Sequence, residues 1–70
     1  MAITAEKLAA RLKAARKAAR ISQSRVSRAL RIPRTAVTQL ENGKRAVSTL
    51  ELYRMSLLYC RSISSFFEET

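Results

Sequence analysis

The residues best suited to chemistry lie between Ser22 and Arg45, where arginine, glutamine and threonine recur on short helical patterns. From Arg34 onward the pattern divides, because Val37 and Leu40 share one face of a predicted helix and polar residues share the other. Such polar side chains can hydrogen-bond base edges in the major groove of duplex DNA, which is wide enough to admit a helix. The candidate base contacts are Arg34, Thr35, Thr38 and Gln39.

Enzymatic chemistry is not expected from this composition. The chain has no histidine, and Cys60 is its single cysteine, so a nucleophile with a basic partner is missing. One cysteine cannot form an internal disulfide or a multi-cysteine zinc site, and the scattered glutamates do not form a metal cage. We therefore expect no catalytic residue, no metal and no cofactor.

Positive charge is concentrated in the first part of the chain. The formal net charge is +9, from 14 basic and 5 acidic residues. Residues 1–45 hold 12 basic and 2 acidic residues, whereas residues 46–70 hold 2 and 3, so the two parts carry +10 and −1. This separation indicates that a polyanion binds the first part. The alternative is a basic surface that serves solubility alone.

The sequence also indicates where in the cell the protein is located. No apolar run approaches the roughly 20 residues of a membrane span, and the N-terminus lacks the apolar core of a signal peptide. A lone cysteine suits a reducing compartment, so we expect the protein to be cytoplasmic. Another interpretation treats the basic, alanine-rich stretch 9–20 as a helix that lies on a membrane surface, although its apolar face contains no tryptophan or phenylalanine.

Helical periodicity predicts an all-α domain of five helices that spans residues 1–70. The helices are expected at about 5–19, 23–30 and 33–42, from 49 to about 60, and around 63–67. The predicted N-caps are Thr4, Ser22, Ser48 and Ser62. Pro33 is expected as the first residue of its helix, and Gly43 as a left-handed terminator. The spacing of Ser48 and Glu51 matches a capping box.

The same periodicity predicts which residues face the core. In the first two helices these are Leu8, Leu12, Ala15, Ala19, Val26, Ala29 and Leu30. In the fourth helix they are Leu50, Tyr53, Leu57 and Leu58. Cys60 is expected to act as a small apolar filler.

The proline-started helix, followed by Q-L-E-N-G-K at 39–44, resembles the Cro and lambda-repressor-type helix-turn-helix family, also called the Xre family, over residues 6–68. This resemblance implies a compact, five-helix DNA-binding domain of the lambda-repressor type, with its helix-turn-helix at about 22–43. The pair R-T at 34–35, followed by G-K-R-A-V-S at 43–48, is also similar to the small controller proteins of restriction-modification systems, which are single-domain dimeric regulators.

The resemblance implies roles for individual residues. The reading helix places its N-terminal residues against base edges, which assigns base contacts to the four polar residues named above. An arginine fork matches guanine and a glutamine amide matches adenine, so Arg34 is expected to favour guanine and Gln39 adenine. Phosphate contacts, which supply affinity without sequence information, are implied for Gln23, Ser24, Arg25, Asn42, Lys44 and Arg45.

Two further roles follow from the resemblance. Arg16 and Glu41 occupy the positions of a structural ion pair, the alternative being a surface pair worth about 0–1 kcal/mol. Ile63, Phe66 and Phe67 lie where the family makes its two-fold contact. Since aromatic residues at helical spacing also build cores, packing within one subunit remains the alternative for these three.

The chain departs from the family pattern at a few turns. Arg20, Arg31 and Cys60 stand where the family usually has glycine at helix ends, and a non-glycine residue with positive φ costs about 1–2 kcal/mol. These turns are therefore either strained or rearranged. Ser27 replaces a small alanine where the two motif helices cross, and its hydroxyl is expected to bond a carbonyl one turn back.

Two functions from different classes remain open. The first is a transcription regulator that binds a palindromic operator in double-stranded DNA as a homodimer. The second is a protein-interaction module, such as an antitoxin or adaptor, built on the same fold. The sequence does not decide whether the chain is complete or is the DNA-binding end of a longer protein.

Overall fold

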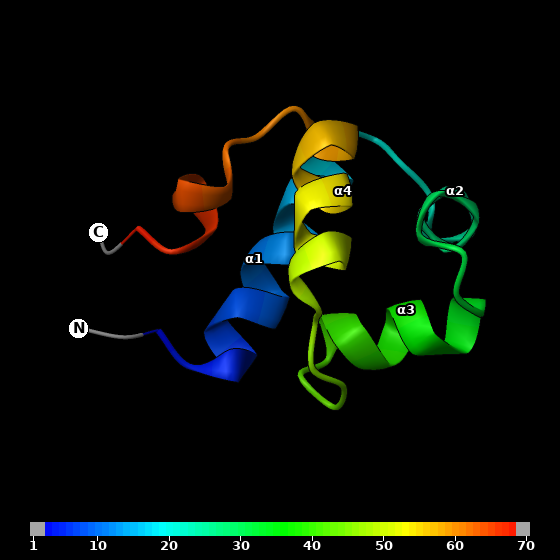
Figure 1. Cartoon of the computed structure of the whole chain (residues 1–70), viewed down its shortest axis with the longest axis horizontal. Helices are drawn as coiled ribbons and strands as arrows, with labels where there is room; N and C mark the ends of the chain where they lie inside the picture. Colours follow the sequence, from blue (N-terminus) through cyan, green and yellow to red (C-terminus); the bar gives the residue numbers. More distant parts are fainter. Residues whose placement is uncertain (1–2, 69–70) are drawn as a thin grey trace.

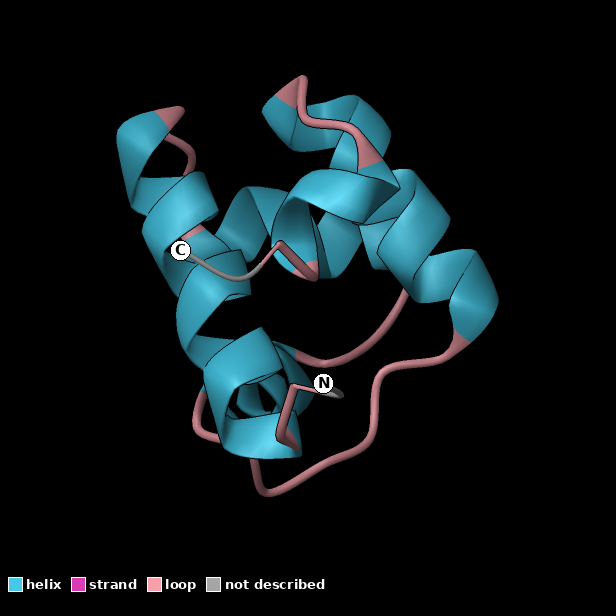
Figure 2. Cartoon of the chain, turned by 90° about the vertical axis from the view of Figure 1, so that its left-hand side faces the viewer, coloured by secondary structure: helices cyan, strands magenta, loops and turns pink. Residues whose placement is uncertain are grey.

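The computed structural model describes residues 3–68, and every regular element within them is helical (Figures 1 and 2). The elements are α1 (Ala5–Ala18), α2 (Gln23–Leu30), α3 (Arg34–Glu41), α4 (Thr49–Tyr59) and the 3-10 helix η1 (Ile63–Phe66). The first two and last two residues of the predicted 1–70 domain lie outside this range. The all-α class is therefore as predicted.

The prediction of a fifth α-helix was wrong for the described residues. Ile63–Phe66 form a 3-10 turn instead, whose backbone bonds run from Ser65 N–H to the Ser62 carbonyl (3.1 Å) and from Phe67 N–H to the Ser64 carbonyl (3.0 Å). Each bond spans three residues, because so short a segment cannot repay the cost of nucleating an α-helix. The Ser62 hydroxyl caps this turn, as predicted, by accepting from Ser65 N–H at 3.3 Å.

Side-chain caps fix where three of the α-helices begin. The Thr4 and Ser22 hydroxyls each accept a hydrogen bond of 3.1 Å from the backbone N–H three residues later. At the start of α4, the Ser48 hydroxyl accepts from Glu51 N–H, and the Glu51 carboxylate accepts from Ser48 N–H. The predicted caps and the capping box are confirmed.

The start of α3 differs from the prediction by one residue. Pro33 is the N-cap, with φ −61° and ψ 152°, and is not the first helical residue. Its extended ψ excludes it from the helix, but its carbonyl accepts from the N–H groups of Ala36 (2.9 Å) and Val37 (3.2 Å). The helix also ends at Glu41, before Asn42. Gly43 has φ +74° and is the left-handed residue that was predicted there.

Three non-glycine residues adopt the left-handed conformation. Arg20, Arg31 and Cys60 have φ of 59°, 57° and 56°. Arg31 and Cys60 are the C-caps of α2 and α4. Of the two alternatives left open, the strained one is therefore realised, at about 1–2 kcal/mol for each residue.

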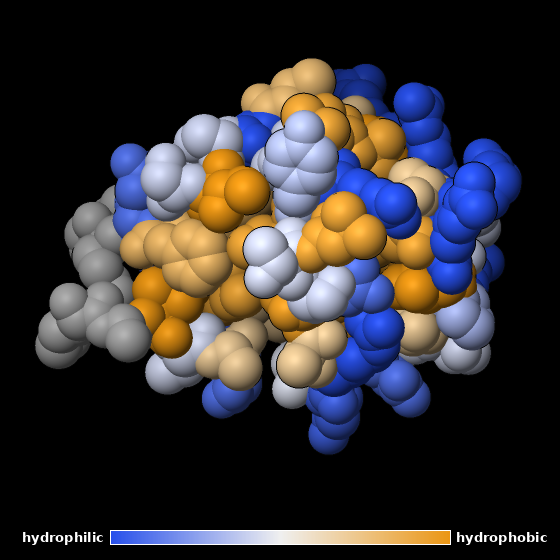
Figure 3. All heavy atoms as spheres, viewed as in Figure 1, coloured by the Kyte–Doolittle hydropathy of each residue, from blue (hydrophilic) through white to orange (hydrophobic). Residues whose placement is uncertain are grey.

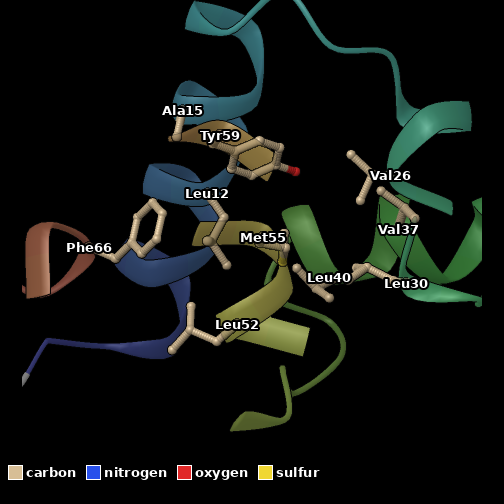
Figure 4. Packing of buried hydrophobic residues seen from close by; sticks show 10 residues of the cluster. All are labelled: Leu12, Ala15, Val26, Leu30, Val37, Leu40, Leu52, Met55, Tyr59 and Phe66. Atoms are coloured by element: carbon tan, nitrogen blue, oxygen red, sulfur yellow. The ribbon is translucent and has the colours of Figure 1, made fainter. Parts of the chain in front are cut away.

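The hydrophobic core lies where the four α-helices meet, with η1 closing one side (Figures 1 and 4). Helix α4 stands in the centre against α1, while α2 and α3 pack on each other and on this pair. Every helix contributes apolar side chains to one continuous cluster. Its buried members are Leu12, Ala15, Val26, Leu30, Val37, Leu40, Leu52, Met55, Tyr59 and Phe66.

The predicted core face of α4 was wrong. Leu52, Met55 and Tyr59 are buried, whereas Leu50, Tyr53 and Leu57 are 56%, 51% and 62% exposed, and Leu58 is half-buried. Both sets recur at helical spacing, because this helix is apolar on most of its circumference. Periodicity alone therefore does not identify its inner face.

Smaller errors concern Cys60 and the alanines. Cys60 was expected to be a small apolar filler, but it is exposed. Ala19 and Ala29 were expected to face the core, but both are exposed. Ala9, which was not singled out, is buried. Alanine is a weak marker of burial because its single methyl group gains little from leaving water.

The described residues offer neither a membrane-spanning helix nor a cluster of metal-binding side chains. None of the helices there is both long enough and apolar enough to cross a membrane. Nor do residues 3–68 contain a cluster of three or more histidine, cysteine or acidic side chains that could hold a metal ion.

Candidate nucleic-acid interface

Helices α2 and α3 form a helix-turn-helix whose turn is Arg31–Pro33. Val26 and Leu30 of α2 and Val37 of α3 are buried at the crossing of the two helices (Figure 4). The left-handed Arg31 ends α2, and the extended Pro33 starts α3. This sequence of backbone conformations reverses the chain within three residues.

Ser27 stabilises the turn between α2 and α3. Its hydroxyl donates to the Ile32 carbonyl at 2.5 Å, and Ile32 N–H donates to the Ser27 carbonyl at 3.1 Å. We expected the hydroxyl to bond a carbonyl one turn earlier, and that prediction was wrong. The reason is local: the left-handed Arg31 turns the chain back over α2, which brings the Ile32 carbonyl within reach. The two bonds fix the junction between α2 and α3.

The outward face of α3 is polar. Val37 and Leu40 point into the core (Figure 4), and the residues on the opposite side are exposed. We call this opposite side the α3 reading face, and it consists of Arg34, Thr35, Thr38 and Gln39. Neither of the two ion pairs among residues 3–68 uses Arg34. Its guanidinium group thus remains available to a ligand.

A buried ion pair lies behind this face. The Arg16 Nε donates to Glu41 Oε2 at 2.6 Å and its Nη2 to Glu41 Oε1 at 3.2 Å, while its Nη1 donates to the Ile21 carbonyl at 2.8 Å. The Glu41 side chain is only 1% exposed and that of Arg16 is 11% exposed. The pair implied by the resemblance is therefore present, and it is buried rather than a surface pair. It joins the last residue of α3 to α1.

Gln23 extends the ion pair toward the surface. Its Nε2 donates to Glu41 Oε1 at 3.0 Å, and its Oε1 lies 3.4 Å from the hydroxyl of Thr38. The Thr38 hydroxyl also lies 3.3 Å from the Arg34 carbonyl. Polar contacts thus run from the buried Glu41 to the exposed reading face. Since an amide nitrogen has two donors, Gln23 keeps one N–H beyond its bond to Glu41.

Tyr59 lies near the same ion pair, and its hydroxyl has no hydrogen-bond partner among the described residues. Burial raises the pKa of this phenol, and the Glu41 carboxylate raises it further. The phenol therefore stays neutral at physiological pH. It adds bulk to the core without adding a charge beside Glu41.

The implied phosphate contacts flank the reading face at two places. Gln23, Ser24 and Arg25 begin α2, whereas Asn42 and Lys44 lie in the loop after α3, at the lower edge of Figure 1. Arg25, Asn42 and Lys44 are exposed, and the other two are half-buried. In Figure 3, hydrophilic side chains gather over the α2 and α3 side of the molecule and along its lower edge. Residues from both places can therefore approach one polyanion.

Arg45 is placed differently from the other candidates. Its Nη1 and Nη2 donate to the two carboxylate oxygens of Glu51, both at 3.0 Å. The hydrogen bonds from Arg45 hold the pKa of Glu51 below its ordinary value, and a bond from the Ser48 backbone lowers it further. Sequence reasoning missed this pair, although a basic residue three positions before a capping box was the available signal. The charge of Arg45 is balanced within the fold.

The three residues expected at a two-fold contact have different environments. Ile63 is half-buried and Phe67 is 42% exposed. Phe66 is only 2% exposed and fills the core, where its carbonyl accepts from Arg11 Nη1 at 3.0 Å. A dimer role for Phe66 is thus incompatible with its burial, and the alternative of packing within one subunit holds for it.

Comparison with known proteins agrees with this geometry. A family model of helix-turn-helix proteins matches residues 12–64, which include α2, the turn, α3 and α4. No curated protein sequence matches the chain. The matched region contains the polar α3 face and the buried Arg16–Glu41 pair. From the match over most of its length, the chain belongs to the Cro/C1-type helix-turn-helix family of DNA-binding regulators.

Proposed function

We propose that this protein regulates transcription by reading a specific sequence in double-stranded DNA, with α3 in the major groove. One observation carries the proposal: the α3 reading face is polar, exposed and backed by a buried ion pair. A reading helix must keep its register while its side chains contact bases. The bonds of Glu41 to Arg16 and Gln23 provide that support.

The proposed base contacts follow from side-chain geometry. Arg34 opens α3 and presents two parallel donors, which suit O6 and N7 of guanine. Gln39 presents a donor and an acceptor, which suit N7 and N6 of adenine. Thr35 and Thr38 present methyl groups that can pack on the methyl group of thymine.

Phosphate contacts supply the remaining part of the proposal. We assign them to the start of α2 and to the loop after α3, through Gln23, Ser24, Arg25, Asn42 and Lys44. Such contacts position the protein and make its affinity depend on salt. Arg45 was included in this set, but it contributes less because Glu51 already binds its guanidinium group.

The proposed complex contains two copies of the chain. Regulators of this fold place one reading helix in each half of a palindromic operator, with half-sites about 34 Å apart. A small domain supplies net stability of only about 3–5 kcal/mol, so a subunit contact would add to it. We propose that the dimer acts as a repressor or controller in the cytoplasm.

Selection of bound duplexes from a random library tests this function. The expected result is one palindromic sequence with a guanine and an adenine at fixed places in each half-site. The matched control is Arg34→Lys, which keeps the charge but lacks the planar fork, and its selection should lose the guanine preference. Enrichment of no sequence would overturn specific reading and favour an antitoxin, an adaptor or a general DNA coat.

A further inference from the structure

Helix α4 carries an apolar stripe that faces solvent. Leu50, Tyr53 and Leu57 are 56%, 51% and 62% exposed, and we call these three residues the α4 stripe. Their spacing of three and then four residues places them on one side of the helix. In Figure 3, apolar side chains gather over the middle of the face where Figure 1 places α4.

The stripe lies outside the buried core cluster of the subunit. The opposite side of α4 fills the core through Leu52, Met55 and Tyr59. The polar contacts that hold the start of α4 come from Ser48 and Glu51. Exposed apolar residues that lie together on a small domain mark an interaction surface, so the stripe is a place where a partner can bind.

Charge favours a second copy of this chain as that partner. Residues 46–70 carry 2 basic and 3 acidic residues, whereas residues 1–45 carry 12 and 2. Two copies that meet through α4 therefore keep their strongly basic parts away from the contact. A polyanion, in contrast, gains little from binding here.

The spacing of the stripe also suits self-association. Alternating steps of three and four residues form the seam along which two helices pack side by side. A two-fold contact requires one surface to match itself. The three residues of the stripe carry no charge, and the exposed Arg54 lies beside them on the same side of α4. Cys60 follows Leu57 by three residues and is exposed, so it continues the same seam at the end of the helix.

The size of the surface limits the affinity. A stable interface buries about 800 Å² on each partner, and three half-exposed side chains supply only part of that area. The expected dimer is therefore weak, with a dissociation constant of about a micromolar or higher.

We infer that the α4 stripe is the subunit interface of a homodimer in which the two α4 helices pack side by side and parallel. The orientation rests on the proposed function. In Figure 1, α3 runs sideways from below the lower end of α4, and its reading face is turned away from the core. Both reading faces reach one side of a duplex only when the two-fold axis runs along α4. That axis makes the helices parallel.

The interface is tested without DNA, by sedimentation equilibrium of the protein over a range of concentrations. The wild type should show reversible dimerisation, and Leu57→Glu should raise the dissociation constant at least about tenfold. The matched control is Ala14→Glu, which adds the same charge at an exposed position of α1 and should leave the constant unchanged. Circular dichroism should show that all three proteins are equally folded.

Two results of that experiment would overturn the interface. The first is a wild type that remains monomeric at millimolar concentration. The second is a dimer that Leu57→Glu leaves intact. Neither result refers to DNA, so sequence-specific binding by a monomer would refute the interface while leaving the reading function in place.

Cys60 tests the orientation. In a parallel pair, Cys60 lies beside its copy, so a short bifunctional thiol reagent should link wild-type subunits, and Leu57→Glu should suppress the link. In an antiparallel pair centred on Tyr53, the two thiols lie about 20 Å apart along the helices. Dimers that resist this linkage would overturn the parallel arrangement, and Cys60→Ser is the control for reaction elsewhere.

Discussion

The outward faces of α3 and α4 differ sharply, although the inward faces of both helices build the same core. The α3 face is polar and led by Arg34, whereas the α4 face exposes the apolar residues Leu50, Tyr53 and Leu57 beside Arg54. A polar, basic face suits the grooves and phosphates of DNA, and an apolar face suits another apolar surface. The contrast is the one that the proposed DNA contact and the proposed subunit contact require of this small domain.

The largest expected effect comes from removing the anchor of the polar face. Glu41→Ala leaves Arg16 and Gln23 without their common acceptor, and breaking a buried pair costs about 3–5 kcal/mol. That loss is comparable to the whole stability of a small domain. Urea unfolding should show a protein that is mostly unfolded at room temperature.

Glu41→Gln is the matched variant for this change. It keeps the size of the side chain and one oxygen acceptor but removes the charge, so it should lose less stability than Glu41→Ala. Equal stability of the wild type and Glu41→Ala would show that the ion pair does not hold α3. The two faces would then differ only in composition, not in how the core supports them.

The next effect concerns reading by α3. Arg34→Ala should weaken binding to the selected operator by about 1–3 kcal/mol and relax the preference at one base pair. Competition between operators that differ at that base pair measures both effects. If the variant instead weakens binding to every sequence equally, Arg34 contacts phosphate and the polar face does not read bases through it.

A smaller effect is expected at the start of α4. The pKa of Glu51 is lowered by Arg45, so the ion pair stabilises the fold at pH values above the ordinary glutamate range. This contribution should disappear as the pH falls through the lowered pKa. A partly exposed pair is worth less than about 1 kcal/mol.

Glu51→Gln isolates that contribution, because glutamine also serves in a capping box. Urea midpoints of the two proteins, measured from neutral pH to pH 2, should differ at neutral pH and converge in acid. A difference that persists at pH 2 would assign the effect to packing or capping. The Arg45–Glu51 ion pair would then make no contribution to the stability of the start of α4.

The smallest effect distinguishes two neighbouring basic residues. Lys44→Ala should reduce the slope of log affinity against log salt by about 0.9, the value for one phosphate contact. Arg45→Ala should change the slope less, since Glu51 binds that guanidinium group. Titrations at several salt concentrations provide the comparison, and a larger change for Arg45 would reverse the assignment.

The two faces also differ in how well the sequence predicted them. On α3, polar residues surround Val37 and Leu40, so only one side can face the core. The exposed face was predicted correctly, and the helix was predicted to within one residue at each end. On α4, apolar residues occupy both sides, and the packing of the other helices decides which side is buried. The sequence of α4 alone does not determine which of its sides the other helices cover.

The remaining differences have local causes that depend on atomic geometry. The caps at Thr4, Ser22 and Ser48 were predictable because each satisfies the backbone of its own helix. The bonds from Ser27 to Ile32 and from Arg45 to Glu51 depend on how a turn brings groups together. Periodicity does not report such distances, and only for the second contact did the sequence offer a signal, the basic residue three positions before the capping box.

The left-handed residues Arg20 and Arg31 have a consequence for how this protein can change. Glycine would relieve the backbone at either turn and raise the melting temperature, but it would also remove a cation from a domain that attracts polyanions. Thermal tolerance and long-range electrostatic capture therefore oppose each other at these two positions. A descendant selected for heat is expected to acquire glycine there and to find its target more slowly.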